Sequence, residues 1–420
     1  MSISQLFPEE GPTLNLNFAG SRTLDPRITF TRTSTGTYMG SDGLIKVAPA
    51  DSPRFDHRYV NGEIESLGLL VEEQRSNLIT YSEDFDTWTK PGTPAGASIS
   101  QDVTISPDGS NTADKIVESN TTGGHGIWLG FTLPQTTTYT FSVFLKADER
   151  TWVDVRAYNS TNGNQFIAKI DLENGDFLEN TGGTVSLDPF SNGWWRFSGV
   201  CSFDNIYTQF FIAPIISNND ASDTSYTGDG SSGIYVWGAQ LEQGSFPTSY
   251  IPRPDASTAT RTPDNVSMVG ENFSSWYNPT EGTIVLDCTP VYDNSSNQYR
   301  RLLSIHNNSG GQTDVIQFIQ TEASNQVSSA VWDGSSFQSG FGKVVNSGTR
   351  YKVAFAVKEN NMNASYDGSI GTDDTSATLP VMTEMDIGSY NNVYQATTHY
   401  NSLRYYPTRL PNSQLQTLTR

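Results

Sequence analysis

The segment from residue 233 to residue 252 constrains the fold more than any other part of the chain. Its sequence is GIYVWGAQLEQGSFPTSYIP. From Ile234 to Leu241 nearly every side chain is apolar or small, which is typical of a strand buried in a β-sandwich. Gly244 and the two prolines that follow lead the chain out of the sheet in an extended conformation. No residue of this segment suits the role of nucleophile or metal ligand, so the segment predicts architecture rather than chemistry.

The composition favours an all-β protein with more than one domain. A chain of 420 residues has room for two or three domains. Its 36 glycines and 20 prolines favour many short strands joined by turns over helices. Only 35% of the residues are hydrophobic, but 11% are aromatic, and flat aromatic rings can fill thin sandwich cores. We therefore expect a folded chain.

Charge and targeting signals exclude several classes of partner. The formal net charge is −20, without a Lys/Arg cluster, so binding to nucleic acid or to anionic lipid is not expected. No run approaches 18 apolar residues, and the start, MSISQLFPEEGP, has neither the basic nor the apolar region of a secretory signal. Cys201 and Cys288 lie in predicted strands of different domains, so we expect two buried free thiols, typical of folding in a reducing cytoplasm.

Residues 1–80 form the first part of the chain. The alternating segment 29–39, an Asp-Gly turn and the return segment 45–48 predict a β-hairpin. The patterns PRFDH and LGLLVEEQRSNLITYSEDF follow it. This part has too few apolar residues for a large core of its own. We therefore expect an attachment or oligomer-contact element packed on its neighbour, with a simple N-terminal extension as the alternative.

Two sandwich-like parts follow. In residues 81–252 the spacing of strands and turns is that of a β-sandwich, with strands at 139–145, 152–158, 166–171, 194–203, 207–216 and 234–241. A polar, proline-containing linker then leads to residues 253–420, with strands at 282–289, 301–306, 315–320, 326–332, 351–358 and 403–406. Near the end, Leu410, Leu415 and Leu418 predict one short helix that caps the last sandwich.

Several of these patterns resemble known families. The order of hairpin, PRFDH and LLVEEQRSNL is similar to a module that recurs in phage virion proteins ahead of a jelly roll. YTFSVFLKAD, NGWWRFSGVCSF and the segment 233–252 resemble the carbohydrate-binding-like jelly roll of phage tail-fibre and virion surface proteins. GTIVLDCTP, RYKVAFAVKENNMNASYDG and LRYYPTRLPNSQLQTL resemble laminin-G-like, concanavalin-type lectin domains. The resemblance implies two sandwich domains, 81–252 and 253–420, behind an N-terminal docking segment, 1–80.

Catalysis is not expected. Glycoside hydrolases on the concanavalin-type fold carry a Glu-x-Asp-x-Glu strand, and the nearest match here is Glu384-Met-Asp-Ile-Gly388. Glu384 and Asp386 would share a face, but Gly388 stands where the acid/base should be, so the two-carboxylate mechanism lacks its partner. The four histidines are far apart, His306 is expected to be a packed or surface residue, and no nucleophile elbow or phosphate loop is present.

Sugar binding is the sharper hypothesis. A carbohydrate site needs an aromatic platform for the face of a pyranose ring, flanked by polar groups that pair with hydroxyls. The candidate platforms are Trp128, Trp152, Tyr158, Trp332, Tyr390 and Tyr394. For each of them the alternative is a core or interface aromatic.

No cofactor is certain from the sequence. The polar loops 218–223 and 227–230 could hold Ca²⁺ through hard oxygen ligands, and the resemblance adds that relatives of both folds often carry a structural calcium.

The resemblance implies a non-enzymatic phage virion structural protein, made in the host cytoplasm and displayed as a tail fibre or as a head fibre or decoration. Its expected partners are other virion proteins of capsid or tail and a host or environmental polysaccharide. We expect a homo-oligomer, with a trimer as the leading hypothesis, in which repeated copies supply avidity. One alternative is a ligand-free capsid cement protein, in which Trp128, Trp152 and Trp332 are buried between subunits. The other is a polysaccharide hydrolase with a carboxylate pair in a cleft.

Overall fold

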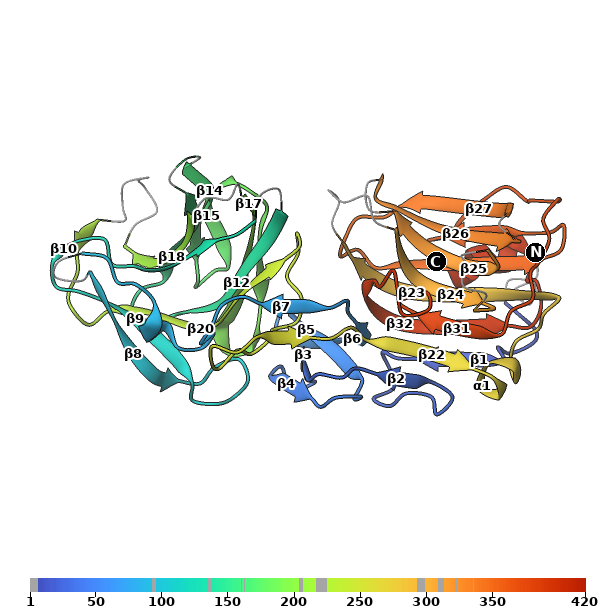
Figure 1. Ribbon diagram of the computed structural model, residues 1–420, viewed down its shortest axis with the longest axis horizontal. Coiled ribbons are helices and arrows are strands. Elements are labelled where there is room, and N and C mark those ends of the chain that lie inside the picture. Colours follow the sequence, from blue (N-terminus) through green and yellow to red (C-terminus); the bar gives the residue numbers. More distant parts are fainter. Residues whose placement is uncertain are drawn as a thin grey trace.

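The computed structural model describes residues 7–420 except for 93–95, 135–136, 160, 162, 204–206, 217–224, 293–298, 309–312, 322–323 and 335. The chain forms two antiparallel β-sandwiches, which lie at the left and right of Figure 1 and are joined by extended strands. The predicted all-β class with two sandwich domains is therefore confirmed.

The first sandwich consists of two main sheets. The five-stranded sheet contains, in spatial order, β11 (Ile127–Thr132), β18 (Tyr207–Ile215), β13 (Trp152–Asn159), β14 (Gly163–Asp171) and β15 (Asp176–Gly182). The six-stranded sheet contains β16 (Val185–Pro189), β17 (Trp194–Phe203), β12 (Thr137–Ala147), β20 (Gly233–Gln243), β9 (Ala113–Glu118) and β8 (Ala97–Thr104). Smaller elements are the pair β10 (Thr122–Gly123) and β19 (Tyr226–Thr227) and two 3-10 turns, η2 (Phe85–Thr87) and η3 (Ser191–Gly193).

Alternation of side chains explains what these strands bury. On β13, Val153, Val155 and Ala157 enter the core between the two sheets, and the residues between them point to the opposite face. Strand β20 is central, between β12 and β9, and is buried over nearly its whole length. A second cluster, containing Trp237 and Tyr250, packs on the outer face of the same sheet. The expectation of a buried closing strand is therefore confirmed.

The second sandwich also has two sheets. The larger contains β30 (Ser369–Ile370), β29 (Asn363–Tyr366), β28 (Tyr351–Lys358), β23 (Glu281–Val291), β32 (Thr397–Tyr406), β6 (Glu63–Val71) and β5 (Arg54–Val60), and β1 (Leu14–Asn17) also pairs with β32. The seven-stranded sheet contains β2 (Thr29–Thr31), β22 (Asn265–Val269), β31 (Glu384–Ile387), β24 (Tyr299–His306), β25 (Val315–Thr321), β26 (Gln326–Asp333) and β27 (Ser336–Val344). The helices are α1 (Glu271–Ser274) and α2 (Asn412–Leu418).

The N-terminal strands are part of the second sandwich. Strands β1, β2, β5 and β6 all lie in its sheets, and Leu16, Phe55 and Leu69 belong to its core. Gly68 allows β6 to approach β32, because a Cβ at this position would lie 2.0 Å from the carbonyl oxygen of Tyr400. The domain boundaries drawn at residues 80 and 252, and the docking role of residues 1–80, stay predictions.

The segment 29–39 does not form one strand, and this prediction is wrong. β2 pairs with β22, and β3 (Gly36–Met39) forms the expected hairpin with β4 (Ile45–Ala48). The chain breaks between them because Arg32 turns inward, where its Nη1 donates to Asp264 Oδ1 at 2.9 Å.

Most other predicted elements are present. Each strand predicted between residues 139 and 406 is found, although β32 begins at Thr397 rather than at residue 403. The C-terminal helix is α2, and Leu415 lies in a small core with Leu410. Part of the predicted linker is a short strand, β21 (Ala259–Arg261), which pairs with β7 (Arg75–Asn77). No described helix is long and apolar enough to cross a membrane.

Five buried charged residues tie the strands between the two sandwiches together. They are Arg32, Arg54, Glu72, Arg261 and Asp264, and we call them the junction. Asp264 accepts from Arg32 and, through Oδ2, from Arg54 Nη2 at 2.5 Å. Glu72 pairs with Arg54 Nη1 at 2.5 Å and with Arg261 Nη1 at 3.1 Å. Because buried charges must be paired, the junction fixes the path of the chain between the sandwiches.

The junction explains the most specific patterns in the sequence. Arg54 belongs to PRFDH and Glu72 to LLVEEQRSNL, whereas Ser249 belongs to the closing segment. The Ser249 amide and hydroxyl donate to Glu72 at 2.8 and 2.7 Å. These patterns therefore hold distant parts of the chain together.

Candidate functional site

Three of the six predicted aromatic residues lie on the same face of the five-stranded sheet. Trp152 and Tyr158 lie on β13, on the face opposite to the core. Trp128 on β11 is directly opposite Phe211 on β18, and Phe211 is directly opposite Arg156 on β13. Because directly paired residues share a face of the sheet, these side chains all project from the same side.

Two further rings complete this face. Tyr207 and Phe211 lie on one face of β18, and the buried Phe210 lies on the opposite face. We call Trp128, Trp152, Tyr158, Tyr207 and Phe211 the aromatic face. The spacing of four residues between Tyr207 and Phe211, which places both on one face of a strand, is the sequence signal that could have identified them.

Glycines on and beside β11 let two of the rings lie close to its backbone. A Cβ at Gly126 would lie 2.3 Å from Phe211 Cζ, and one at Gly130 would lie 2.0 Å from Tyr207 Oη. The Trp128 and Tyr207 rings are 6.1 Å apart between centroids and nearly perpendicular, at 86°. The glycines thus fix how the rings are presented.

The aromatic face is accessible. Tyr158 and Tyr207 are 41% and 44% exposed, and Trp128 and Trp152 are half-buried. A half-buried ring keeps one orientation while part of its surface remains available, which suits a stacking platform.

A charged pair stands among the rings. The Arg156 guanidinium lies 5.6 Å from the Phe211 ring centroid, and its Nε donates to Asp154 Oδ1 at 3.1 Å. Asp154 is fully buried. Burial lowers the pKa of Arg156, while the charge of Glu179 opposes this shift. Because Asp154 also binds the second nitrogen of the guanidinium, the side chain of Arg156 is held in one orientation.

Further polar groups surround the face. Gln209, half-buried, pairs in the sheet with Gly130 and with Tyr158. On the same side of the sheet, Lys169 Nζ lies 3.1 Å from Glu179 Oε2. The arrangement can stack flat apolar surface and donate or accept hydrogen bonds beside it.

The other three predicted residues lie on the second sandwich. Trp332 on β26 is half-buried and lies 5.4 Å from the Phe337 ring. Tyr394 is 42% exposed, with the Arg301 guanidinium 5.1 Å from its centroid. Tyr390 is only 4% exposed, so in this structure its ring is not an open platform.

Tyr390 covers a buried histidine that is held between two carboxylates. The Tyr390 and His306 ring centroids are 4.6 Å apart. His306 Nε2 lies 3.0 Å from Asp386 Oδ2, and Nδ1 lies 3.4 Å from Glu384 Oε1. The expectation that Glu384 and Asp386 share a face is confirmed, and His306 is packed, as expected.

The carboxylates at His306 do not form an open pair. Burial and the charge of Asp386 raise the pKa of Glu384, and His306 opposes this shift. Gly388 follows the end of β31 with a φ of +81°, and a Cβ there would meet Val71. The sequence did not indicate that His306 joins these carboxylates, because His306 lies on β24 and the two carboxylates lie on β31, about 80 residues later in the chain.

The hypothesis that loops 218–223 and 227–230 bind calcium is not tested by the structure and stays a prediction. Loop 218–223 lies outside the described residues. In loop 227–230, Asp229 accepts hydrogen bonds from the amides of Ser231 and Ser232 at 2.7 and 2.8 Å. Among the described residues no group of three or more His, Cys, Asp or Glu side chains could hold a metal ion.

Comparison with known proteins finds only distant similarity. No protein-family model and no curated protein matches the chain. Among solved structures, the CBM40 of the Ruminococcus gnavus IT-sialidase bound to α2,3-sialyllactose is 15% identical, over 36% of this chain and 88% of that one, with a TM-score of 0.30. Domain 4 of the arabinanase AbnA from Geobacillus stearothermophilus, in complex with arabinotriose, is 12% identical over 42% and 83%, with a TM-score of 0.29. A SAP-like pentraxin from Limulus polyphemus is 12% identical over 33% and 70%, with a TM-score of 0.27. At these TM-scores the similarities carry no argument about binding, which depends on the residues of this chain.

Proposed function

We propose that the protein is a non-enzymatic phage virion surface protein that adheres to polysaccharide through the aromatic face. The observation that carries the binding proposal is that five aromatic side chains project from the same side of the five-stranded sheet. Their rings come from β11, β13 and β18, so the sheet itself sets their spacing.

The chemistry of this face fits a sugar chain. The apolar face of a pyranose ring stacks on Trp128 or Trp152, because both present flat, partly exposed surface. Arg156 and Gln209 stand beside the rings and bind sugar hydroxyls. In the second sandwich Tyr390 is buried and Tyr394 is engaged by Arg301, so the first sandwich is the better-supported site.

The virion part of the proposal is supported by the sequence resemblance. The N-terminal patterns and the two sandwich segments occur in the order expected of a phage virion protein. In that setting the protein is a homo-oligomer, with a trimer as the leading hypothesis, and binds other proteins of the tail or head. Repeated copies turn weak single sugar contacts into firm adhesion. Tail fibre and head decoration remain alternatives within the proposal.

Affinity electrophoresis through gels containing host surface polysaccharide tests the binding function. We expect retardation of the wild-type protein and a loss of at least about tenfold in affinity for Trp152→Ala, since one stacked ring contributes on the order of 1.4 kcal/mol. Tyr299→Ala, which removes an exposed ring on the second sandwich, is the matched control and should bind normally. Equal retardation of both variants would refute the aromatic face as the site, and no retardation of the wild type by any polysaccharide would favour a ligand-free cement protein.

Imaging of purified virions labelled with an antibody to residues 253–420 tests the location. Label at the tail tip indicates a receptor-binding fibre, and label over the head indicates decoration. Absence of label from every particle would refute the virion proposal.

A further inference from the structure

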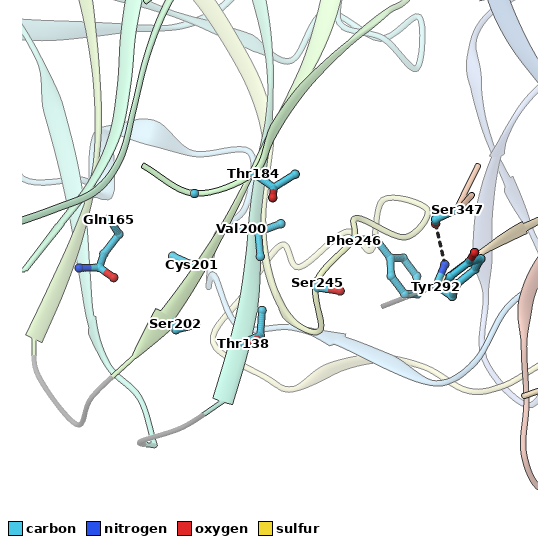
Figure 2. A pocket seen from close by; sticks show the side chains of 11 residues that line it. Thr138, Gln165, Thr184, Val200, Cys201, Ser202, Ser245, Phe246, Tyr292 and Ser347 are labelled. Atoms are coloured by element: carbon cyan, nitrogen blue, oxygen red, sulfur yellow. Dashed lines mark hydrogen bonds between the residues drawn. The ribbon is translucent and has the colours of Figure 1, made fainter. Parts of the chain in front are cut away.

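A groove of about 600 Å³ lies between the two sandwiches, apart from the aromatic face. Figure 2 shows its lining. Thr138 and Ser202 come from the six-stranded sheet, and Ser245 and Phe246 from the segment that leaves the first sandwich. Tyr292 follows β23 of the second sandwich, so residues of both sandwiches line the groove. The volume lies within the range typical of sites for small ligands.

The described residues that line the groove are uncharged. None of them is Asp, Glu, Lys, Arg or His, although the chain has 45 acidic and 25 basic residues. A charged ligand that binds here would lose part of its hydration without gaining an ion pair to these residues. This described lining therefore favours a neutral ligand.

Five side chains of the groove have hydroxyl or amide groups with no hydrogen-bond partner among the described residues. In the described part of the chain, the side chains of Thr138, Gln165, Thr184, Ser202 and Ser245 make no hydrogen bond to another residue. Each can both donate and accept, which matches the hydroxyl groups of a sugar.

A β-bulge aims Gln165 at the groove. Ala157 pairs with Phe166 and Tyr158 with Asn164, so Gln165 has no residue opposite it on β13. Bulges of this kind redirect a side chain and recur beside functional sites.

Two rings stand at the opposite end of the groove from Gln165, where Figure 2 shows Phe246 beside Tyr292. Phe246 is held by the Arg75 guanidinium, 5.0 Å from its centroid. The Tyr292 hydroxyl donates to the carbonyl of Val345, and its amide donates to Ser347 Oγ at 2.9 Å. This wall of the groove is therefore formed before any ligand binds.

We propose that the groove binds a segment of an uncharged polysaccharide, with hydroxyl and amide groups of the first sandwich bound to its sugar hydroxyls and the wall formed by Phe246 and Tyr292 at one end. This inference rests on the proposed adhesion to polysaccharide, and it adds a second contact region and the charge class of the ligand. The two regions would bind one chain or two neighbouring chains, and the groove would set the preference for neutral sugars.

The test compares retention of the full-length protein in gels containing dextran, mannan, arabinan or the acidic polymer alginate. Ser202→Trp fills the groove, and Ser100→Trp places the same side chain at an exposed position on β8 of the same sheet, so it is the matched control. Gln165→Ala removes a free amide without removing any hydrogen bond within the described part of the chain. Near-ultraviolet circular dichroism and the melting temperature show whether each variant is folded.

We expect the wild type to bind at least one neutral polymer and not alginate. Ser202→Trp should weaken that binding by at least about tenfold and Gln165→Ala by about threefold, with Ser100→Trp unchanged. Retention by alginate alone, or full binding by folded Ser202→Trp, would overturn the inference. If Trp152→Ala abolishes binding while Ser202→Trp does not, the aromatic face is supported as a binding site and the groove is refuted as one. If the wild type binds no polymer, the proposed function and this inference fall together.

Discussion

Replacing Asp264 by Asn should destabilise the protein far more than the loss of one surface charge. Asp264 is fully buried and accepts from Arg32 at 2.9 Å, from Arg54 at 2.5 Å and from the Glu72 amide at 2.9 Å. The substitution leaves the three buried guanidinium groups of the junction with Glu72 as its one remaining carboxylate. Removing one partner of a buried ion pair costs about 3–5 kcal/mol, because the charge left behind is neither solvated nor neutralised.

Urea unfolding followed by tryptophan fluorescence and by far-ultraviolet circular dichroism measures this loss. Two sandwiches can unfold in separate steps, so the two signals should be compared before a single free energy is derived. We expect the first transition to move to lower urea by the equivalent of about 3–5 kcal/mol. Asp25→Asn is the control, because its pair with Arg27 is partly exposed and such pairs contribute about 0–1 kcal/mol. A loss below about 1 kcal/mol for Asp264→Asn would refute the view that the junction holds the sandwiches together.

Three further predictions concern backbone packing, pH and thiol chemistry. Gly68→Ala should lower the free energy of unfolding by at least about 2 kcal/mol in the same urea assay, because the added Cβ meets the Tyr400 carbonyl and φ is +85°; a neutral result would contradict the packing of β6 on β32. Two arginines hold the pKa of Glu72 well below its usual range, although burial opposes this shift. The stability that the Glu72 carboxylate contributes is therefore present above the unfolded pKa, near 4.5, and is lost as the pH falls below that value. Between pH 7 and pH 3 the melting temperature should fall less for Glu72→Gln than for the wild type. Burial raises the pKa of the Cys201 thiol to about 12, and Cys288 is buried as well. A thiol reagent at pH 8 should therefore label neither cysteine until the protein unfolds. Fast labelling of the native protein would contradict this prediction.

The sequence predicted the strands well because their signals are local. Segments such as 194–203 and 234–241 alternate or are continuously apolar, and both are strands with nearly the predicted ends. The break after Thr31 was missed because its cause is the burial of Arg32 against Asp264, more than 200 residues away. A contact at that separation leaves no trace in local periodicity.

The candidate site was predicted in part. Trp152 and Tyr158 share a strand, so their common face followed from the period of two, and the structure places them on it. That Trp128 joins them depends on the order β11-β18-β13, which the sequence does not specify. Tyr390 illustrates the converse, since an aromatic residue beside two asparagines resembles a platform, but its ring is buried against His306.

The central claim is that the aromatic face binds polysaccharide, and ¹⁹F NMR of the protein labelled with 5-fluorotryptophan at its eight tryptophans tests it most directly. On titration with a polysaccharide that retards the protein, the resonances of Trp128 and Trp152 should shift, whereas those of the buried Trp194 and Trp237 should not. Resonances would be assigned by single Trp→Phe variants. If Trp128 and Trp152 stay unchanged at saturation, or only other tryptophans respond, the aromatic face is not the binding site.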